Sequence, residues 1–361
     1  MTKTTAASGE VLATDAGLQS WTSAMPTGTR VTRLDYSSTS GVDDSRTSVS
    51  GAVFVPSGSW PQGGWPLIAY AHGTTGLARD CGPSDHPDMF GDIATIGSFV
   101  RAGYAVVTTD YQGLGIRVDA PPHPYLEPRT AAHNVIDAVR AARAVEPTIG
   151  PKWVVVGPSQ GGAAAWATAE LYPRFRDADS GDLVGAVAMS PVLDVSRYPT
   201  AAQDGTLNSA QRFLYPLIVV GASHVDPQID PADHLGGMSA SEISSLVSCA
   251  TGRTALAAQT HSRDASTLRS TPGANAELDA AVSKFVLPQQ HTDVPILAMY
   301  GTADEITPVD VMETSLSRAC TLGDPVVRDR REGQGHSFDP GPILGSWISS
   351  RLQGLPFHAD C

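Results

Sequence analysis

The sequence predicts a doubly wound α/β protein, in which helices cover both faces of a mostly parallel sheet and a helical segment is inserted late in the chain. Six short apolar segments alternate with segments of helical periodicity. Continuous apolar runs are typical of strands in a parallel sheet buried on both faces, and their repeated alternation with helices predicts a doubly wound sheet. The alternation stops between Asp194 and Asp293, a stretch too long for a structureless loop in a compact domain.

The patterns give the elements in order. The expected core strands are Pro66–His72, Tyr104–Asp110, Trp153–Gly157, Val184–Ser190, Pro295–Gly301 and Pro325–Arg330. The expected helices are Gly91–Ala102, Arg129–Val145, Gly161–Tyr172, Val309–Cys320 and Pro342–Leu352. Upstream, Arg30–Ser37 and Ser48–Pro56 carry alternating and β-branched residues, which predicts an antiparallel pair. Residues 1–25 are interpreted as a polar, partly ordered lead-in.

The interruption predicts a separate structural unit. We expect residues 195–293 to form a mostly helical cap, inserted into a main domain built from residues 1–194 and 294–361. Helical patterns within the insertion are Ser209–Val220, Ala240–Cys249 and Ala276–Phe285.

Composition excludes several classes of protein. The chain has 361 residues, of which 41% are hydrophobic, so global disorder is excluded. The formal net charge of −13 disfavours nucleic acid and anionic lipid headgroups as partners. No apolar run approaches the ~18 residues of a transmembrane helix, and the first ten residues lack the apolar region of a signal peptide.

Four scattered cysteines bear on the cellular compartment. They are Cys81, Cys249, Cys320 and Cys361, and none has close C-x-x-C spacing. An even, scattered set indicates two disulfides in a secreted protein whose signal peptide has been removed. The alternative is four buried thiols in a cytosolic enzyme. The terminal Cys361 favours disulfides, because a chain end frays unless it is tied down.

The segment Gly157–Gly162, GPSQGG, carries the strongest chemical signal. It follows the apolar strand WVVV and precedes the helical pattern AAAWATAELY. In this setting G-x-S-x-G is a nucleophile elbow, whose strained turn exposes Ser159 at the end of the strand. The N–H groups of the following helix would face a developing oxyanion. The alternative is a glycine-rich turn in which Ser159 only caps the helix.

A nucleophilic serine requires a base and an orienting acid, in the chain order Ser, Asp or Glu, His. Asp304 follows the strand Pro295–Gly301 and is therefore expected at the catalytic edge of the sheet. Its neighbour Glu305 is the alternative, and either acid could instead cap the next helix. His336 lies in a glycine-rich loop after the last strand and is the expected base.

Two main-chain N–H groups are expected to form the oxyanion hole. One belongs to Gln160, and the other to the loop HGTTG, where Thr74 is the first choice and Thr75 the alternative. His72 is expected to hold this loop by hydrogen bonds. A simple turn at the end of the strand is the competing interpretation.

Taken together, these motifs resemble the secretory lipase family. The resemblance covers Ser48 to Cys361 and rests on HGTTG, TDYQGLG (Thr109–Gly115), GPSQGG, GTADEITP and GQGH, with the long insertion before the acid. It implies an α/β-hydrolase fold with a helical cap. It also implies a Ser-His-Asp carboxylester hydrolase acting on lipid or other hydrophobic esters, with Ser159 as nucleophile, Asp304 as acid and His336 as base. In the family signature DYQGLG, we interpret Asp110 as structural and place Tyr111 near the acyl site.

The cap is expected to bind the substrate, because an insertion after Val184–Ser190 lies over the catalytic edge of the sheet. The candidate binding residues lie on one predicted helix: Phe213, Leu214, Leu217 and Ile218. Cap segments are moderately polar, so an esterase for short-chain or bulky esters is an alternative to a lipase. An acyltransferase using the same triad and a non-catalytic binding protein are further alternatives.

The expected fold selects one disulfide pairing from three. The helices before Cys320 and Cys361 flank the same late strand, which predicts Cys320–Cys361. Cys81 follows the oxyanion loop and Cys249 lies in the cap above it, which predicts Cys81–Cys249.

We expect no metal or other cofactor, and a monomer or weak dimer whose partner is a small-molecule or lipid ester. One acidic cluster could suggest a metal site, but we interpret its residues as helix caps and polar loop residues: Asp226, Asp230, Asp233 and His234.

Overall fold

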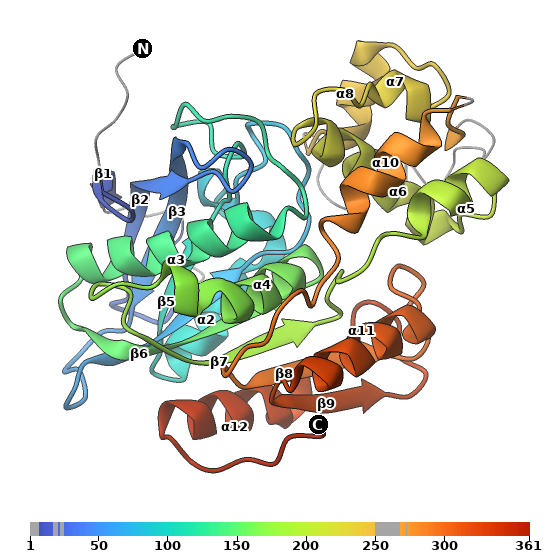
Figure 1. Ribbon diagram of the computed structural model, residues 1–361. Coiled ribbons are helices and arrows are strands. Elements are labelled where there is room, and N and C mark those ends of the chain that lie inside the picture. The colour runs from blue at the N-terminus through green and yellow to red at the C-terminus, as the bar shows by residue number, and fades with distance from the viewer. Residues whose placement is uncertain (1–6, 17–20, 22–24, 250–267, 272) are drawn as a thin grey trace.

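The computed structural model describes residues 7–16, 21, 25–249, 268–271 and 273–361 (Figure 1). Nine strands form one sheet in the order β1-β2-β3-β5-β4-β6-β7-β8-β9. The strands are β1 Val11–Ala16, β2 Arg30–Thr39, β3 Arg46–Val55, β4 Trp65–Ala71, β5 Ala105–Thr109, β6 Ile149–Pro158, β7 Asp182–Met189, β8 Ile296–Gly301 and β9 Val326–Arg331. From β5 to β9 every neighbouring pair is parallel, whereas β1, β2, β3 and β5 pair antiparallel. The predicted doubly wound, mostly parallel sheet is confirmed.

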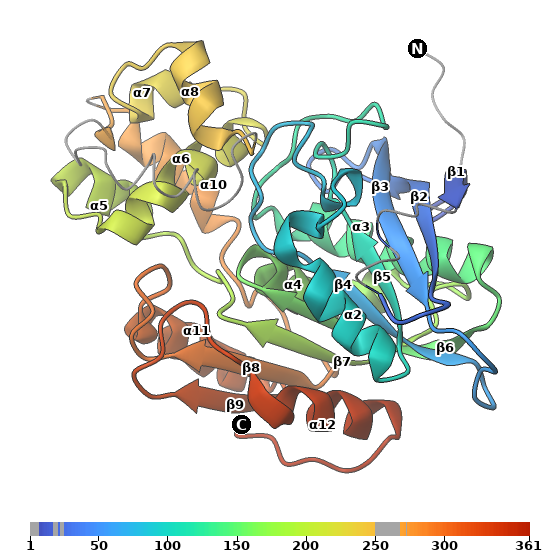
Figure 2. The same cartoon turned by 180° about the vertical axis from the view of Figure 1, so that it is seen from behind.

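Helices cover both faces of the sheet (Figures 1 and 2). The helices of the main domain are α2 Ile93–Arg101, α3 Pro128–Val145, α4 Gln160–Phe175, α11 Val309–Leu322 and α12 Gly341–Leu352, with 3-10 turns at Pro83–Asp85 and Met89–Gly91. Side chains of α3, α4 and α11 share one hydrophobic cluster, while those of α2 and α12 belong to a second cluster. Alternate residues of the central strands enter the two clusters, so Trp153 and Val155 face one layer and Val154 and Val156 the other.

The strand β1 was not predicted from the sequence. It pairs antiparallel with β2 at the edge of the sheet, and all but its first residue are exposed. A strand without a buried face has no apolar periodicity, so the interpretation of residues 1–25 as a lead-in missed it.

The cap lies in the crossover between the parallel neighbours β7 and β8. Its described helices are α5 Tyr198–Asp204, α6 Ser209–Ser223, α7 Pro231–His234, α8 Ala240–Val247 and α10 Asn275–Ser283. The short helices α5 and α7 were not predicted, and residues 250–267 of the predicted cap lie outside the described residues. Figure 1 shows these helices beyond the end of the sheet at which β7 ends, and the chain runs from α10 back to the opposite end, where the parallel strand β8 begins.

Two disulfides join distant parts of the chain. Cys81 is bonded to Cys249, with a Cα–Cα distance of 5.5 Å, and thereby links the loop after β4 to the end of α8. Cys320 of α11 is bonded to the terminal Cys361, with a Cα–Cα distance of 5.0 Å. Beside the first disulfide, the N–H of Leu77 donates to the carbonyl oxygen of Val247 at 2.7 Å, so the cap is attached to the main domain by a covalent bond and a backbone hydrogen bond.

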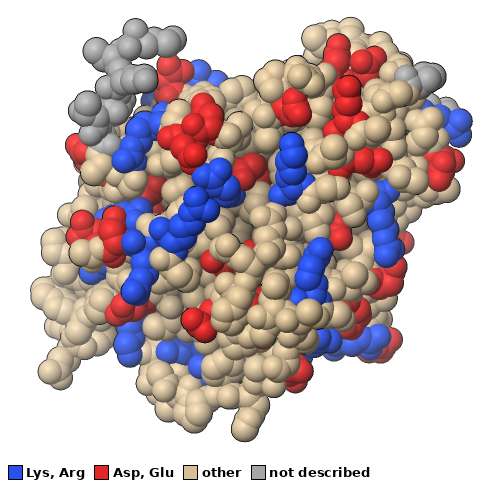
Figure 3. All heavy atoms as spheres, in the orientation of Figure 1, with Lys and Arg blue, Asp and Glu red and all other residues tan. Residues whose placement is uncertain are grey.

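The surface carries charges of both signs. On the face drawn in Figure 3, acidic side chains are interspersed with basic ones. Among the described residues, no helix combines the length and apolar composition that crossing a membrane requires.

Candidate active site

Ser159 occupies a strained turn between β6 and α4. Its φ of 56° and ψ of −118° lie outside the regions that most residues adopt. The turn brings α4 so close to β4 that a Cβ on Gly161 would lie 1.9 Å from the carbonyl oxygen of Ala71, and one on Gly157 would lie 2.1 Å from that of Gly161. Only glycine fits at both positions. The N–H of Ser159 donates to Met189 of β7 at 2.8 Å, which anchors the strained residue to the sheet.

His336 connects Ser159 to Asp304. Its Nε2 lies 2.9 Å from Ser159 Oγ, and its Nδ1 lies 2.7 Å from Asp304 Oδ2. Because an ionised carboxylate only accepts hydrogen bonds, Nδ1 carries the proton and Nε2 is free to accept from the serine hydroxyl. The three residues, separated widely in the sequence, therefore meet with the geometry of a nucleophile, a base and an orienting acid.

Asp304 is buried and fully engaged by its own loop. Its carboxylate accepts from the N–H groups of Ile306 at 2.8 Å and Thr307 at 3.0 Å, and from the Thr307 hydroxyl at 2.7 Å. Burial by itself would raise the pKa of Asp304, but His336 and the donors of Thr307 outweigh it and hold the pKa below its ordinary value of 3.8. The competing acid, Glu305, is exposed to solvent.

The loop HGTTG lies against Ser159. A Cβ on Gly73 would lie 3.8 Å from Cβ of Ser159. Thr75 is buried and its hydroxyl donates to the carbonyl oxygen of Cys81 at 2.8 Å, so this side chain ties the loop to the disulfide. Gln160 is the first residue of α4, where the N–H has no partner within the helix.

Hydrogen bonds of His72, the first residue of this loop, connect the loop to Asp110. His72 is buried, and its ring nitrogens face the carbonyl oxygens of Gly73 at 2.6 Å and Asp110 at 3.3 Å. The Asp110 carboxylate accepts from the hydroxyls of Ser50 and Ser84 and from the N–H of Ser84 at 2.8 Å. Burial raises the pKa of Asp110 to about 6 although these donors oppose the shift.

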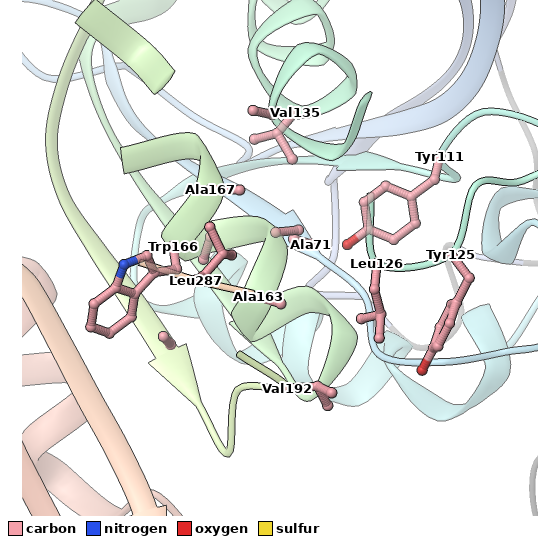
Figure 4. Close-up of a cluster of buried hydrophobic side chains, with 14 of the residues drawn as sticks. Ala71, Tyr111, Tyr125, Leu126, Val135, Ala163, Trp166, Ala167, Val192 and Leu287 are labelled. Carbon is pink, nitrogen blue, oxygen red and sulfur yellow. The ribbon is translucent and has the colours of Figure 1, made fainter. Parts of the chain in front are cut away.

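Tyr111 is a buried neighbour of the site. Its φ is 63°, and its hydroxyl donates to the carbonyl oxygen of His72 at 3.1 Å. Tyr111 lines a small cavity of about 20 Å³ together with Gln160 and Leu126. Figure 4 shows Tyr111, Leu126 and Tyr125 in one hydrophobic cluster with Ala163 of α4.

Two residues of this region were missed at the level of sequence. The ring Nε2 of His123 lies 2.9 Å from the side-chain nitrogen of Gln160, and the hydroxyl of Tyr125 lies 2.7 Å from that of Thr74. His123 and Tyr125 belong to a proline-rich loop before α3 without a recognisable motif, and only the tertiary contacts draw attention to them.

The predicted substrate residues of α6 lie inside the cap. Leu214, Leu217 and Ile218 are buried, and Phe213 is partly buried against the same core. A cavity of about 640 Å³ lies between the cap and the main domain. Of helix α6 it is lined by Val220, and none of the four predicted residues lines it. Further apolar lining residues of this cavity, here called the cap cavity, are Leu77, Pro122, Met238, Ile243 and Val247.

The acidic cluster of the cap has structural partners. Asp230 caps α7 by accepting from the N–H of Ala232 at 2.9 Å, and Asp226 accepts from the N–H of Gln228 at 3.1 Å. His234 is buried with its Nδ1 3.0 Å from the Ser270 hydroxyl.

Comparison with known proteins identifies the family. A model of the secretory lipase family matches residues 89–359, which is most of the chain. The chain belongs to the secretory lipase family. As a member of the secretory lipase family, the protein is a carboxylic ester hydrolase of the lipase and esterase type. Its family and its two disulfides are consistent with an extracellular protein.

Solved structures support the fold of this secretory lipase family member. The rice cell wall degrading esterase LipA from Xanthomonas oryzae is 20% identical, with a TM-score of 0.75 over 96% of this chain and 97% of that one. Candida antarctica lipase A in its closed state is 17% identical, with a TM-score of 0.70 over 98% and 85%. A putative hydrolase from Legionella pneumophila is 16% identical, with a TM-score of 0.73 over 96% and 97%. The predicted α/β-hydrolase fold is confirmed, and no curated protein sequence matches the chain.

Proposed function

We propose that this hydrolase cleaves hydrophobic esters through an acyl-enzyme intermediate on Ser159. The observation that carries the proposal is the hydrogen-bonded series from Ser159 Oγ through His336 to Asp304, at a strained turn between a strand and a helix. This arrangement matches the requirements of nucleophilic catalysis, in which a base activates the hydroxyl and a buried acid orients the base.

The first half of the reaction forms the acyl-enzyme. His336 Nε2 takes the proton of the Ser159 hydroxyl as Oγ attacks the ester carbonyl carbon, and the carbonyl oxygen becomes an oxyanion. The N–H groups of Gln160 and Thr74 are the proposed donors to this oxyanion. The C–O bond to the alcohol then breaks, and His336 returns the proton to the departing alkoxide.

Water completes the cycle. His336 accepts a proton from a water molecule, whose oxygen attacks the acyl carbon, and the same donors stabilise the second oxyanion. Collapse of this intermediate releases the carboxylic acid and returns the proton to Ser159. Asp304 remains ionised throughout and stabilises the imidazolium that forms twice in each cycle.

Hydrophobic esters are the proposed substrate class, because the cap cavity of about 640 Å³ is lined mainly by apolar side chains of the cap and of the loops that follow β4 and β5. We further propose that the enzyme acts outside the cell after removal of a signal peptide, on the basis of its family and its two disulfides.

Active-site labelling tests the proposal. A fluorophosphonate should modify the wild-type enzyme at Ser159 with loss of p-nitrophenyl ester hydrolysis, and Ser159→Ala should be unlabelled, folded and reduced by several powers of ten in kcat. Labelling at another serine, or turnover by Ser159→Ala above about a hundredth of wild type, would reject the assignment. Product analysis with added alcohol separates the hydrolase from an acyltransferase.

A further inference from the structure

We infer that His123 and Tyr125 are positioning residues for the oxyanion hole, and that the segment joining them fixes both donors at once. The inference rests on the proposed function, because it takes Gln160 and Thr74 as the oxyanion donors. Each donor residue has one side-chain contact with this segment: Gln160 with His123 and Thr74 with Tyr125. These partners lie in one loop, although Gln160 and Thr74 belong to different parts of the fold.

The hydrogen bonds of His123 define its role. Nδ1 lies 2.9 Å from the carbonyl oxygen of Gln112, which can only accept, so Nδ1 carries the proton. Nε2 must then accept from the amide nitrogen of Gln160, at 2.9 Å. His123 is 4% exposed and Gln160 5% exposed, so water cannot replace either bond without opening the structure. Burial lowers the pKa of His123 to about 3, and the ring therefore stays a neutral acceptor at any pH near neutrality.

Tyr125 holds the second donor in the same manner. Its ring is fully buried, and its hydroxyl lies 2.7 Å from the hydroxyl of Thr74. The next residue, Leu126, has a φ of 65°, a left-handed conformation that costs about 1–3 kcal/mol in a residue other than glycine and persists only where its surroundings impose it.

The cap restrains this segment from the other side. Gly221 of α6 packs so closely on Tyr125 that a Cβ on Gly221 would lie 2.5 Å from the tyrosine Cβ. His224, at the end of the same helix, has its Nδ1 2.8 Å from the carbonyl oxygen of His123. The segment is thus held between the cap and the two donor residues, so a displacement of the segment would move both N–H groups relative to Ser159.

The test separates positioning from general structural support. His123→Ala and Tyr125→Phe should each lower kcat on p-nitrophenyl butyrate, His123→Ala by about 10- to 100-fold, which is less than the loss of a whole oxyanion donor. KM should stay nearly constant, and affinity for a boronic acid inhibitor, whose oxygen occupies the oxyanion hole, should fall in parallel with kcat/KM. His123→Gln should restore most of the activity, because its amide can donate to Gln112 and accept from Gln160.

Two matched variants serve as controls. His133→Ala removes a ring of α3 that stacks on Phe175 of α4. Tyr172→Phe removes a hydroxyl that donates to the carbonyl oxygen of Gly181. Both should keep wild-type kcat even where the melting temperature falls.

Defined outcomes overturn the inference. A folded His123→Ala with kcat within about threefold of wild type, an unchanged boronate affinity, or a His123→Gln as impaired as His123→Ala would each reject it. If His123→Ala fails to fold, Tyr125→Phe decides, because phenylalanine keeps the buried ring and the Cβ that packs on Gly221 and loses only the hydroxyl. Activity in Ser159→Ala would reject the proposed nucleophile instead, so failure of the inference and failure of the proposed function are distinct.

Discussion

The carboxylate of Glu170 accepts the backbone N–H of Gln289 at 3.1 Å through both of its oxygens. This contact joins α4, the helix that begins after Ser159, to the segment that returns from the cap to β8. The indole N–H of Trp166 donates to the same carboxylate at 3.0 Å, and the side chain of Gln290 donates to the carbonyl oxygen of Glu170 at 2.9 Å. The helix that follows Ser159 and the segment that returns from the cap are therefore fixed to each other at a buried ionisable group.

Glu170 should make stability depend on pH. Burial raises its pKa from 4.5 to about 7, although the N–H of Gln289 opposes the shift. Between these values the folded protein retains a proton that the unfolded chain has released, so the free energy of unfolding falls as pH rises through this window. Because glutamine does not titrate in this range, Glu170→Gln should reduce the loss in free energy of unfolding with rising pH by up to about 3 kcal/mol.

Urea denaturation of both proteins at several pH values checks this expectation. The wild-type and Glu170→Gln curves should converge at low pH and separate above neutrality, with the variant more stable. A difference that does not vary with pH would show that Glu170 has an ordinary pKa in the folded protein.

The two neighbouring acids after β8 should differ in their effect on catalysis. Asp304→Asn leaves a side chain that cannot orient His336 with a carboxylate, so kcat should fall by about 10³- to 10⁴-fold. Glu305→Gln changes only an exposed group and should be nearly silent. Steady-state kinetics on one ester decide between them, and a larger loss in Glu305→Gln would mean that the orienting acid has been misassigned.

The bond between Cys320 and Cys361 should stabilise the main domain without affecting chemistry. It closes a loop over a sequence separation of 41, for which chain entropy gives about 4 kcal/mol. The double variant Cys320→Ser/Cys361→Ser should lose stability of this order in denaturant titrations and retain kcat at low temperature. Free thiols at these positions in the native wild-type protein, detected by non-reducing peptide mapping, would contradict the pairing.

The bond between Cys81 and Cys249 should limit movement of the cap. It lies beside the hydrogen bond from Leu77 to Val247, at the place where α8 meets the chain directly after the loop HGTTG. Cys81→Ser/Cys249→Ser should therefore be cleaved faster within the cap in limited proteolysis, while the main domain remains resistant. Equal cleavage rates would mean that packing alone holds the cap in place.

The cap cavity should influence chain-length preference. Ile243→Trp places a large side chain in a cavity that this residue lines, so rates on long-chain p-nitrophenyl esters should fall relative to the acetate. Ser245→Trp adds the same side chain at an exposed position of the same helix and should leave the profile unchanged. An identical profile in both variants would show that the acyl chain binds elsewhere.

Local sequence was sufficient to predict those features whose structure depends on one short, contiguous segment of the chain. The elbow around Ser159 could be predicted because a strand, a turn and a helix are contiguous in the sequence, with a glycine on either side of the turn. The chain order Ser, acid, His then restricted the acid and the base to the loops that follow the last two predicted strands. Asp304 and His336 were predicted on that basis. The central strands β4 to β8 were predicted equally well, since each contains a continuous apolar run.

Tertiary structure decided what depends on the relative placement of distant segments. The helix α6 is apolar on all sides from Leu214 to Val220, so its periodicity could not show that Val220, and not Leu217, would face the cap cavity. His123 and Tyr125 carry no motif, and their partners are 37 and 51 residues away. Such contacts arise when distant segments of the chain pack together, and their energy depends on a geometry that no local pattern encodes. The sequence alone therefore determined the layered fold and predicted the groups that we propose to react, whereas packing between distant segments decided which side chains surround those groups.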